Sequence, residues 1–250
     1  MLRVRDPVSG AITSLGALAG SMVRVGFVLA SDADELSCTR VLVIGDLVSR
    51  VLEDLHSAQV LTAVIADDRT KVDHLLRSDL MVRPVCDVFC DQHGAETYLG
   101  RPLDFLVTGG GADHETALRG PTLAVAPARC AAQYWPAEPT TLRFALAKVP
   151  YAWPLDVTDS LLERSERVVE TWRDHVAQWS RHPSRPIPST WRAAVIAALD
   201  DDLDVARLVA MMHELDRTGI VEPGAKFEAF AYLDRVLAVD LMRNLGRARR

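Results

Sequence analysis

The sequence has little lysine, little cysteine and no long apolar run. Only three of its 28 basic residues are lysines, and the formal net charge is −6, which argues against a broad electrostatic grip on nucleic acid. Four cysteines in 250 residues are too few for a dense disulfide framework, so a reducing cytoplasm is the expected location. No apolar stretch approaches the roughly 20 residues of a transmembrane helix, and we expect no membrane association.

The start of the chain imitates a secretory signal peptide in part. Residues 11–23 are largely apolar and follow Arg3 and Arg5, as the apolar core of a signal peptide follows a basic start. Asp6, Pro7 and the helix-breaking glycines do not fit this pattern. We expect a surface hairpin here instead.

Two apolar, β-branched stretches enclose a helical pattern. Residues 23–30 and 59–66 have the length and composition of central strands. Residues 31–35 supply a helix N-cap and first-turn acids, and apolar residues then recur at helical spacing as far as Leu55. A strand, a helix and a strand in this order form a right-handed crossover with parallel strands.

The pattern stays α/β to about residue 150 and is helical after it. Residues 72–80 predict a short helix, residues 81–89 a strand interrupted by Pro84, and residues 122–126 a further strand followed by a proline-rich connection. We therefore predict a Rossmann-like α/β domain over residues 1–150 and an all-α helical bundle over residues 151–250.

Capping residues mark where the later helices begin. Thr158 precedes a long amphipathic pattern, and Asp204 opens another that ends at Arg217. Either Ser189 or Thr190 is expected to cap the helix between them.

Three successive glycines lie where a buried strand should end. The mainly apolar residues 103–107 predict a parallel strand, and the glycines after it allow a ligand to approach the backbone closely. Ligands of open α/β sheets bind at such carboxyl ends, although an ordinary flexible turn has the same composition. The predicted binding residues are Leu29, Ser31, Asp67, Asp68, Gly109, Gly110, Gly111, Asp113 and His114.

One group of residues could in principle form a zinc site. Cys86, Cys90 and His93, with Asp91 nearby, have donor atoms suited to zinc. The spacing is not the usual Cys-x2-Cys and no second pair follows, so isolated buried thiols are favoured and no metal site is predicted.

Two further clusters have both a functional and a purely structural interpretation. His114 and Glu115 suit an acid/base pair, but also the solvated first turn of a helix. Asp200, Asp201 and Asp202 suit a hard cation, although a solvated helix end is favoured. The sequence contains no P-loop, no Ser-centred nucleophile elbow and no Gly-x-Gly-x-x-Gly, and we assign no catalytic residue.

In order and spacing, these elements resemble cysteinyl-tRNA synthetases and the related cysteine ligase of mycothiol biosynthesis. Tyr98-Leu99-Gly100 and the later run from Gly109 to Asp113 resemble a Tyr-Leu-Gly … Gly-Gly-Gly-x-Asp stretch of that family. The resemblance implies a class I synthetase-type nucleotide-binding fold followed by helices. The other similar stretches are residues 2–4, 46–52, 65–68, 139–146 and 199–206.

The family's ATP-handling motifs do not match this sequence. Its His-Ile-Gly-His signature, which neutralises charge on ATP, falls on Glu35, Leu36, Ser37 and Cys38. A carboxylate and a thiol cannot replace two imidazoles that face a triphosphate. The family's mobile lysine loop should follow the strand that ends near Ala126, yet no lysine lies there.

The family's zinc ligands, which bind the substrate thiolate, are not retained either. They fall on Leu29, near Cys90, near Asp113 and near Ala117, so one ligand of four is kept and no zinc site is expected. We also expect that the family's insertion between the two halves of the nucleotide-binding domain is largely missing and that no anticodon-binding domain follows.

The resemblance and these departures together imply a degenerate, truncated paralogue. We expect a non-catalytic or repurposed protein that binds a small adenylate-like or amino-acid-like ligand, or a protein partner, with no cofactor, no membrane and no tRNA. The alternative is a repurposed ATP-dependent aminoacyl (cysteine-type) ligase that uses ATP and residues such as His114 and Arg129.

Overall fold

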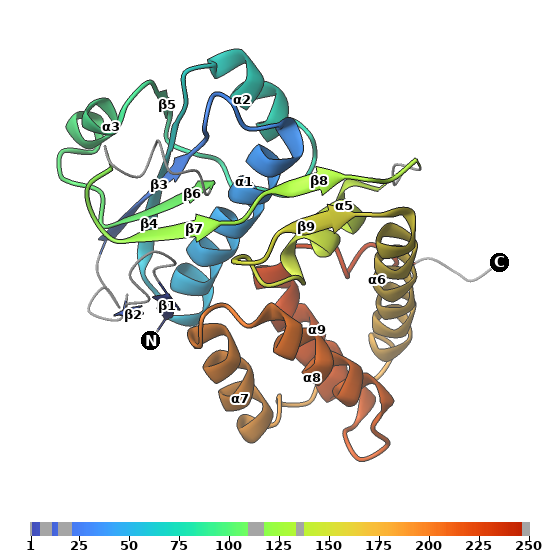
Figure 1. The fold of residues 1–250 in the computed structure, drawn as a ribbon. Helices are drawn as coiled ribbons and strands as arrows, with labels where there is room; N and C mark the ends of the chain where they lie inside the picture. Colours follow the sequence, from blue (N-terminus) through green and yellow to red (C-terminus); the bar gives the residue numbers. More distant parts are fainter. Residues whose placement is uncertain (1, 6–11, 15–21, 110–117, 134–137, 247–250) are drawn as a thin grey trace.

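A five-stranded parallel sheet forms the centre of the first half of the chain (Figure 1). The computed structural model describes residues 2–5, 12–14, 22–109, 118–133 and 138–246. The strands lie in the order β5-β4-β3-β6-β7, and every neighbouring pair is parallel, which confirms the predicted Rossmann-like α/β fold. Their bounds are β3 (Met22–Val28), β4 (Gln59–Ile65), β5 (Val88–Phe89), β6 (Phe105–Gly109) and β7 (Thr122–Val125).

Helices pack on the sheet and make up most of the second half of the chain, as predicted. The first half contains α1 (Glu35–Arg50), a π-helical turn η2 (Val51–Leu55), α2 (Arg69–Leu76) and α3 (Gln92–Leu99). The second half contains α5 (Pro139–Ala147), α6 (Asp159–Trp179), α7 (Ser189–Asp200), α8 (Val205–Arg217) and α9 (Pro223–Leu237).

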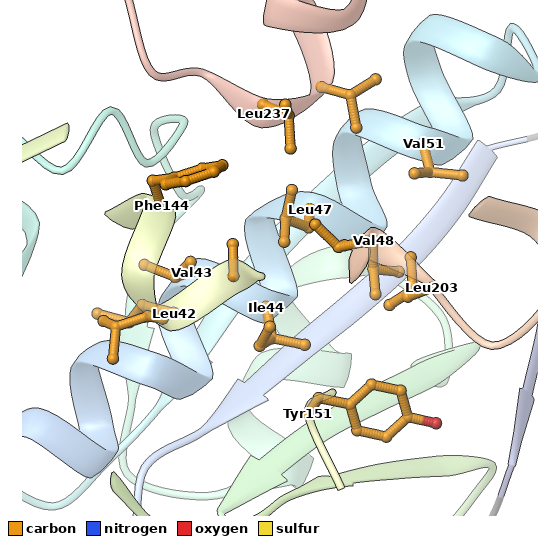
Figure 2. Close-up of a cluster of buried hydrophobic side chains, with 14 of the residues drawn as sticks. Leu42, Val43, Ile44, Leu47, Val48, Val51, Phe144, Tyr151, Leu203 and Leu237 are labelled. Atoms are coloured by element: carbon orange, nitrogen blue, oxygen red, sulfur yellow. The ribbon is translucent and has the colours of Figure 1, made fainter. Parts of the chain in front are cut away.

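Helix α1 is the buried centre of the molecule. Asp34 caps it by accepting a hydrogen bond of 2.9 Å from the backbone N–H of Ser37. The helix contacts β3, β6 and β7 on one side and α5 and α9 on the other, so every residue after its first is buried. Figure 2 shows Leu47 of this helix near Phe144 of α5 and Leu237 of α9. One apolar core therefore extends from the sheet into the helical half.

Three local predictions are wrong. Residues 81–87 form no strand, because Pro84 has no N–H to donate and only residues 88–89 pair with β4. The connection after β7 contains a strand, β8 (Ala128–Cys130), which pairs in parallel with β9 (Leu155–Val157). Pro188, not Ser189 or Thr190, is the N-cap residue of α7, and no side chain caps that helix.

The N-terminal segment forms an antiparallel pair, of which only the second strand lies within the residues 11–23 expected to form a surface hairpin. Strand β1 (Arg3–Arg5) pairs with β2 (Ile12–Ser14), and the remainder of the apolar segment up to residue 21 lies outside the described residues. Leu2 and Val4 are buried in the core. In the part of the chain that the structure describes, no helix has the length and hydrophobicity needed to cross a bilayer.

A buried ionic network joins α1 to three distant segments. Asp46 Oδ2 accepts hydrogen bonds of 2.6 Å from both Arg50 Nε and Arg143 Nη2, and Asp46 Oδ1 accepts one of 2.8 Å from the backbone N–H of Arg83. Arg143 also donates to the carbonyl oxygen of Leu237 at the end of α9, at 2.6 Å. The side chains of Asp46 and Arg143 are 1% and 0% exposed, so their charges depend on one another rather than on water.

We predict that Asp46→Asn lowers the free energy of unfolding by about 3–5 kcal/mol, because it leaves two buried guanidinium groups without a counter-charge. Urea denaturation measures the change. Asp201→Asn is the matched control, since Asp201 pairs with Arg3 at the surface and both side chains are more than half exposed. The control should cost less than about 1 kcal/mol, and equal losses in the two variants would contradict the prediction.

Candidate functional site

A cavity of about 540 Å³ lies at the carboxyl ends of β3, β4 and β5. It lies beside the junction of β3 and β6, where the strand order reverses and open α/β sheets bind their ligands. The volume falls within the range of about 300–1,000 Å³ that is typical of small-molecule sites. Position and size together make this cavity the candidate ligand site.

The floor of the cavity is apolar and comes from the strand ends. Val28 ends β3 and Leu29 follows it, Ile65 ends β4 and Ala66 follows it, and Leu118 adds a further apolar side chain. The backbone N–H of Leu29 donates to the carbonyl oxygen of Ile65 at 2.9 Å, so the two strand ends are fixed to one another. The floor suits the apolar part of a ligand.

The first turn of α3 supplies most of one polar wall. Asp91 is the N-cap residue and accepts a hydrogen bond of 2.7 Å from the backbone N–H of Gly94. Cys90 and His93 line the cavity with an exposed thiol and an exposed imidazole. A thiol and an imidazole in this wall provide the two most reactive side chains of the described lining.

A glutamine and a glutamate fix α3 to the segment before β7. Gln92 Nε2 donates to Glu96 Oε1 at 2.7 Å and to the carbonyl oxygen of Arg119 at 2.8 Å. The backbone N–H of Arg119 donates in return to Gln92 Oε1 at 3.0 Å, and Glu96 Oε1 also accepts from the N–H of Leu103. These bonds position one side of the cavity. Sequence reasoning missed Gln92, Glu96 and Arg119, since nothing local indicates contacts between residues 27 positions apart.

Only some of the predicted binding residues line this cavity. Leu29 and Asp67 do so. Ser31 is exposed and does not belong to the lining, and Gly109 ends β6 without contributing to it. Asp68 instead caps α2, because its Oδ1 accepts a hydrogen bond of 3.0 Å from the N–H of Lys71. The predicted residues Gly110, Gly111, Asp113 and His114 lie outside the described residues, as does Glu115.

The cysteines are placed differently from the expectation of isolated buried thiols. Cys38 is buried, and this burial raises its pKa, whereas Cys86, Cys90 and Cys130 are exposed. Cys90 and His93 share the cavity, but Cys86 does not belong to its lining. Within the described residues, no three His, Cys, Asp or Glu side chains are grouped as a metal site requires. Leu29 has no donor atom, so the described part of the cavity does not fit the zinc of the family that the sequence resembles.

The aspartates before α8 have separate partners. Asp200 Oδ1 lies 2.6 Å from His56 Nε2, and Asp201 Oδ1 lies 2.8 Å from Arg3 Nη2. Asp204 caps α8, as its position in the sequence predicts. Carboxylates that diverge in this way suit the termini of two helices better than a cation site.

Comparisons with known proteins give a partial similarity. No family model matches the chain. It is 34% identical over 107 residues to a cysteine–tRNA ligase of Methylocella silvestris, and 37% identical over 78 residues to one of Paracoccus denitrificans. These alignments cover 43% and 31% of this chain, but only 20% and 16% of the relatives. The chain thus spans about a fifth or less of these relatives, which gives a weak family-level link.

Substitutions of the adjacent residues Asp67 and Asp68 should affect ligand affinity and the free energy of unfolding separately. Asp68→Ala should lower the free energy of unfolding by about 1 kcal/mol through loss of the α2 cap, and should leave ligand affinity unchanged. Asp67→Ala should change stability by less than about 0.5 kcal/mol, because the side chain is exposed, but should alter ligand affinity. Denaturation and calorimetry on both variants test this. The reverse assignment of the two effects would show that the cavity is misidentified.

Proposed function

We propose that the protein is a degenerate, truncated relative of cysteine–tRNA ligases that binds a small adenylate-like or amino-acid-like molecule, or a protein partner, and does not charge tRNA. The observation that carries the proposal is the cavity at the strand ends with Leu29 in its floor. In the family that the sequence resembles, this position holds a cysteine that ligates zinc. A leucine replaces that metal contact with apolar surface, which favours a ligand held without a metal–thiolate bond.

The charges of the cavity support a ligand other than a triphosphate. Its described lining includes the carboxylates of Asp67, Asp91 and Glu96, against the single guanidinium of Arg119. A triphosphate requires positive charge or free helix-terminal N–H groups to replace its water. At the start of α3, the N–H of Gly94 is already bonded to Asp91. An amino group suits this lining better than a phosphate group does.

The segment where the resemblance places the ATP signature has structural contacts in this protein. Ser37 Oγ hydrogen bonds to the side chain of Asp34 at 2.8 Å and to the backbone of Ala128 at 3.1 Å. Cys38 is buried with a raised pKa, and Glu35 carries negative charge at the surface. None of these groups offers a positive charge to a phosphate, which supports a loss of ATP handling.

The alternative function is a repurposed ATP-dependent ligase. Arg129 is one of the residues proposed for the ligase reaction. It is exposed on β8, where it pairs with Asp156 of β9, and it does not line the cavity. Pyrophosphate exchange, measured with each of the twenty amino acids, separates the two functions. Exchange that depends on one amino acid would establish the ligase.

We predict that ATP binds more weakly than about 1 mM in isothermal titration calorimetry, because the described cavity lining has an excess of carboxylates. A dissociation constant in the micromolar range would contradict the non-catalytic function. Adenosine titrated in parallel shows whether any weakness arises from the phosphates.

We predict that a thermal-shift screen of nucleosides, amino acids and aminoacyl-sulfamoyl adenosines yields a ligand whose binding is lost in Ala66→Phe. Ala66 lines the cavity, so a phenyl ring there occupies ligand volume. Thr70→Phe is the matched control, because it adds the same ring to an exposed position on α2 that does not line the cavity. A ligand that still binds the Ala66 variant would rule out this cavity.

A further inference from the structure

A second cavity, of about 580 Å³, lies between the start of α1, α2, β8 and α5. None of its lining residues belongs to the cavity at the strand ends, so the two sites can be tested separately. Its volume is also typical of small-molecule sites.

The inner surface of this second cavity is aliphatic. Leu36 of α1, Leu75 of α2 and Leu142 of α5 contribute to it, together with Leu80 and Pro139. The four leucines are each less than 9% exposed and belong to the main core. A ligand in this cavity would therefore place an apolar body against apolar side chains that are already fixed by packing.

The polar lining is acidic. Asp34 and Glu35 lie at the start of α1, and the described lining contains no lysine or arginine. Partial burial opposes ionisation of Asp34, but hydrogen bonds from Ser37 outweigh it and lower the pKa, so this carboxylate is charged at neutral pH. Two carboxylates exceed the partial positive charge of about half a unit at a helix N-terminus. The exposed imidazole of His74 lies beside Glu35, with its Nε2 at 3.5 Å from Glu35 Oε1.

We propose that the second cavity binds a primary amine with an apolar body, such as an arylalkylamine. The apolar body lies against the leucines and the ammonium group lies at the mouth, where Glu35 accepts its hydrogen bond in place of His74. An anion of the same shape is repelled by the same two carboxylates, and a neutral analogue gains only the apolar contact. This site does not depend on the function proposed for the cavity at the strand ends.

The exposed thiol of Cys130 lines the second cavity and provides a direct readout. In a Cys86→Ser, Cys90→Ser variant it is the remaining exposed thiol, since Cys38 is buried. The rate at which methyl methanethiosulfonate modifies it is measured with 4-phenylbutylamine, 4-phenylbutanol and 4-phenylbutanoate. At ten times its dissociation constant the amine should slow modification about tenfold, because only the ligand-free protein reacts. At the same concentration the alcohol and the carboxylate should protect far less.

Two controls make the outcome decisive. In a Cys86→Ser, Cys130→Ser variant the exposed thiol is Cys90, in the other cavity, and the amine should leave its modification rate unchanged. Adding Glu35→Gln to the first variant should raise the dissociation constant of the amine, measured from the protection, about tenfold, the usual loss for a charge-assisted hydrogen bond, without changing the melting temperature. Equal protection by the three compounds, equal protection of Cys90, or no protection at millimolar amine would each overturn the proposal.

Discussion

Among the described residues, the packing of α1 depends on the buried carboxylate of Asp46. It is shared between Arg50 and Arg143, each at 2.6 Å, and both arginines use their remaining N–H groups on backbone carbonyl oxygens. Arg50 donates to Arg235 and Arg143 donates to Leu237, so both hold the last turn of α9. Each guanidinium brings positive charge to a helix C-terminus, where it is favoured. Apolar packing alone does not set the position of α1 along α5 and α9, because it is not directional. The hydrogen bonds of this network do set that position.

Another buried arginine, Arg40, fixes α1 to the connection beyond the sheet, and its hydrogen-bond partners among the described residues are carbonyl oxygens rather than carboxylates. Arg40 Nη1 donates to the carbonyl oxygens of Ala126 and Trp153 at 2.9 and 2.7 Å, and Nη2 donates to those of Val149 and Pro150 at 3.4 and 3.0 Å. Burial lowers its pKa to about 10, so the guanidinium remains charged at neutral pH. Four carbonyl dipoles thus replace a counter-ion, and the end of β7 is held against the segment after α5.

The strand–helix–strand unit could be predicted because its signals are local. The caps Asp34, Thr158 and Asp204 each accept a hydrogen bond from a residue three positions ahead, so sequence neighbours determine them. Strands β8 and β9 have three residues each and pair across a gap of more than 20 residues, so no periodicity reveals them. The residues of the candidate site also fall into a predictable and an unpredictable group. The strand ends at Leu29 and Asp67 follow from topology, whereas the bonds between Gln92 and Arg119 arise only once α3 has packed.

The two ends of α1 differ in how far a substitution would destabilise the protein, and this difference matters for ligand binding. Its C-terminal half holds Asp46 and Arg50, and substitution there disturbs charges buried on every side. At its N-terminus, Asp34 is needed as the cap, but Glu35 is exposed at the mouth of a cavity and has no capping role, so a change of its charge costs little stability. A protein of this fold can therefore keep its core arginine contacts while the groups that face a ligand change sign. The acidic walls of the two cavities are the physical reason to seek a ligand with an amino group rather than a triphosphate.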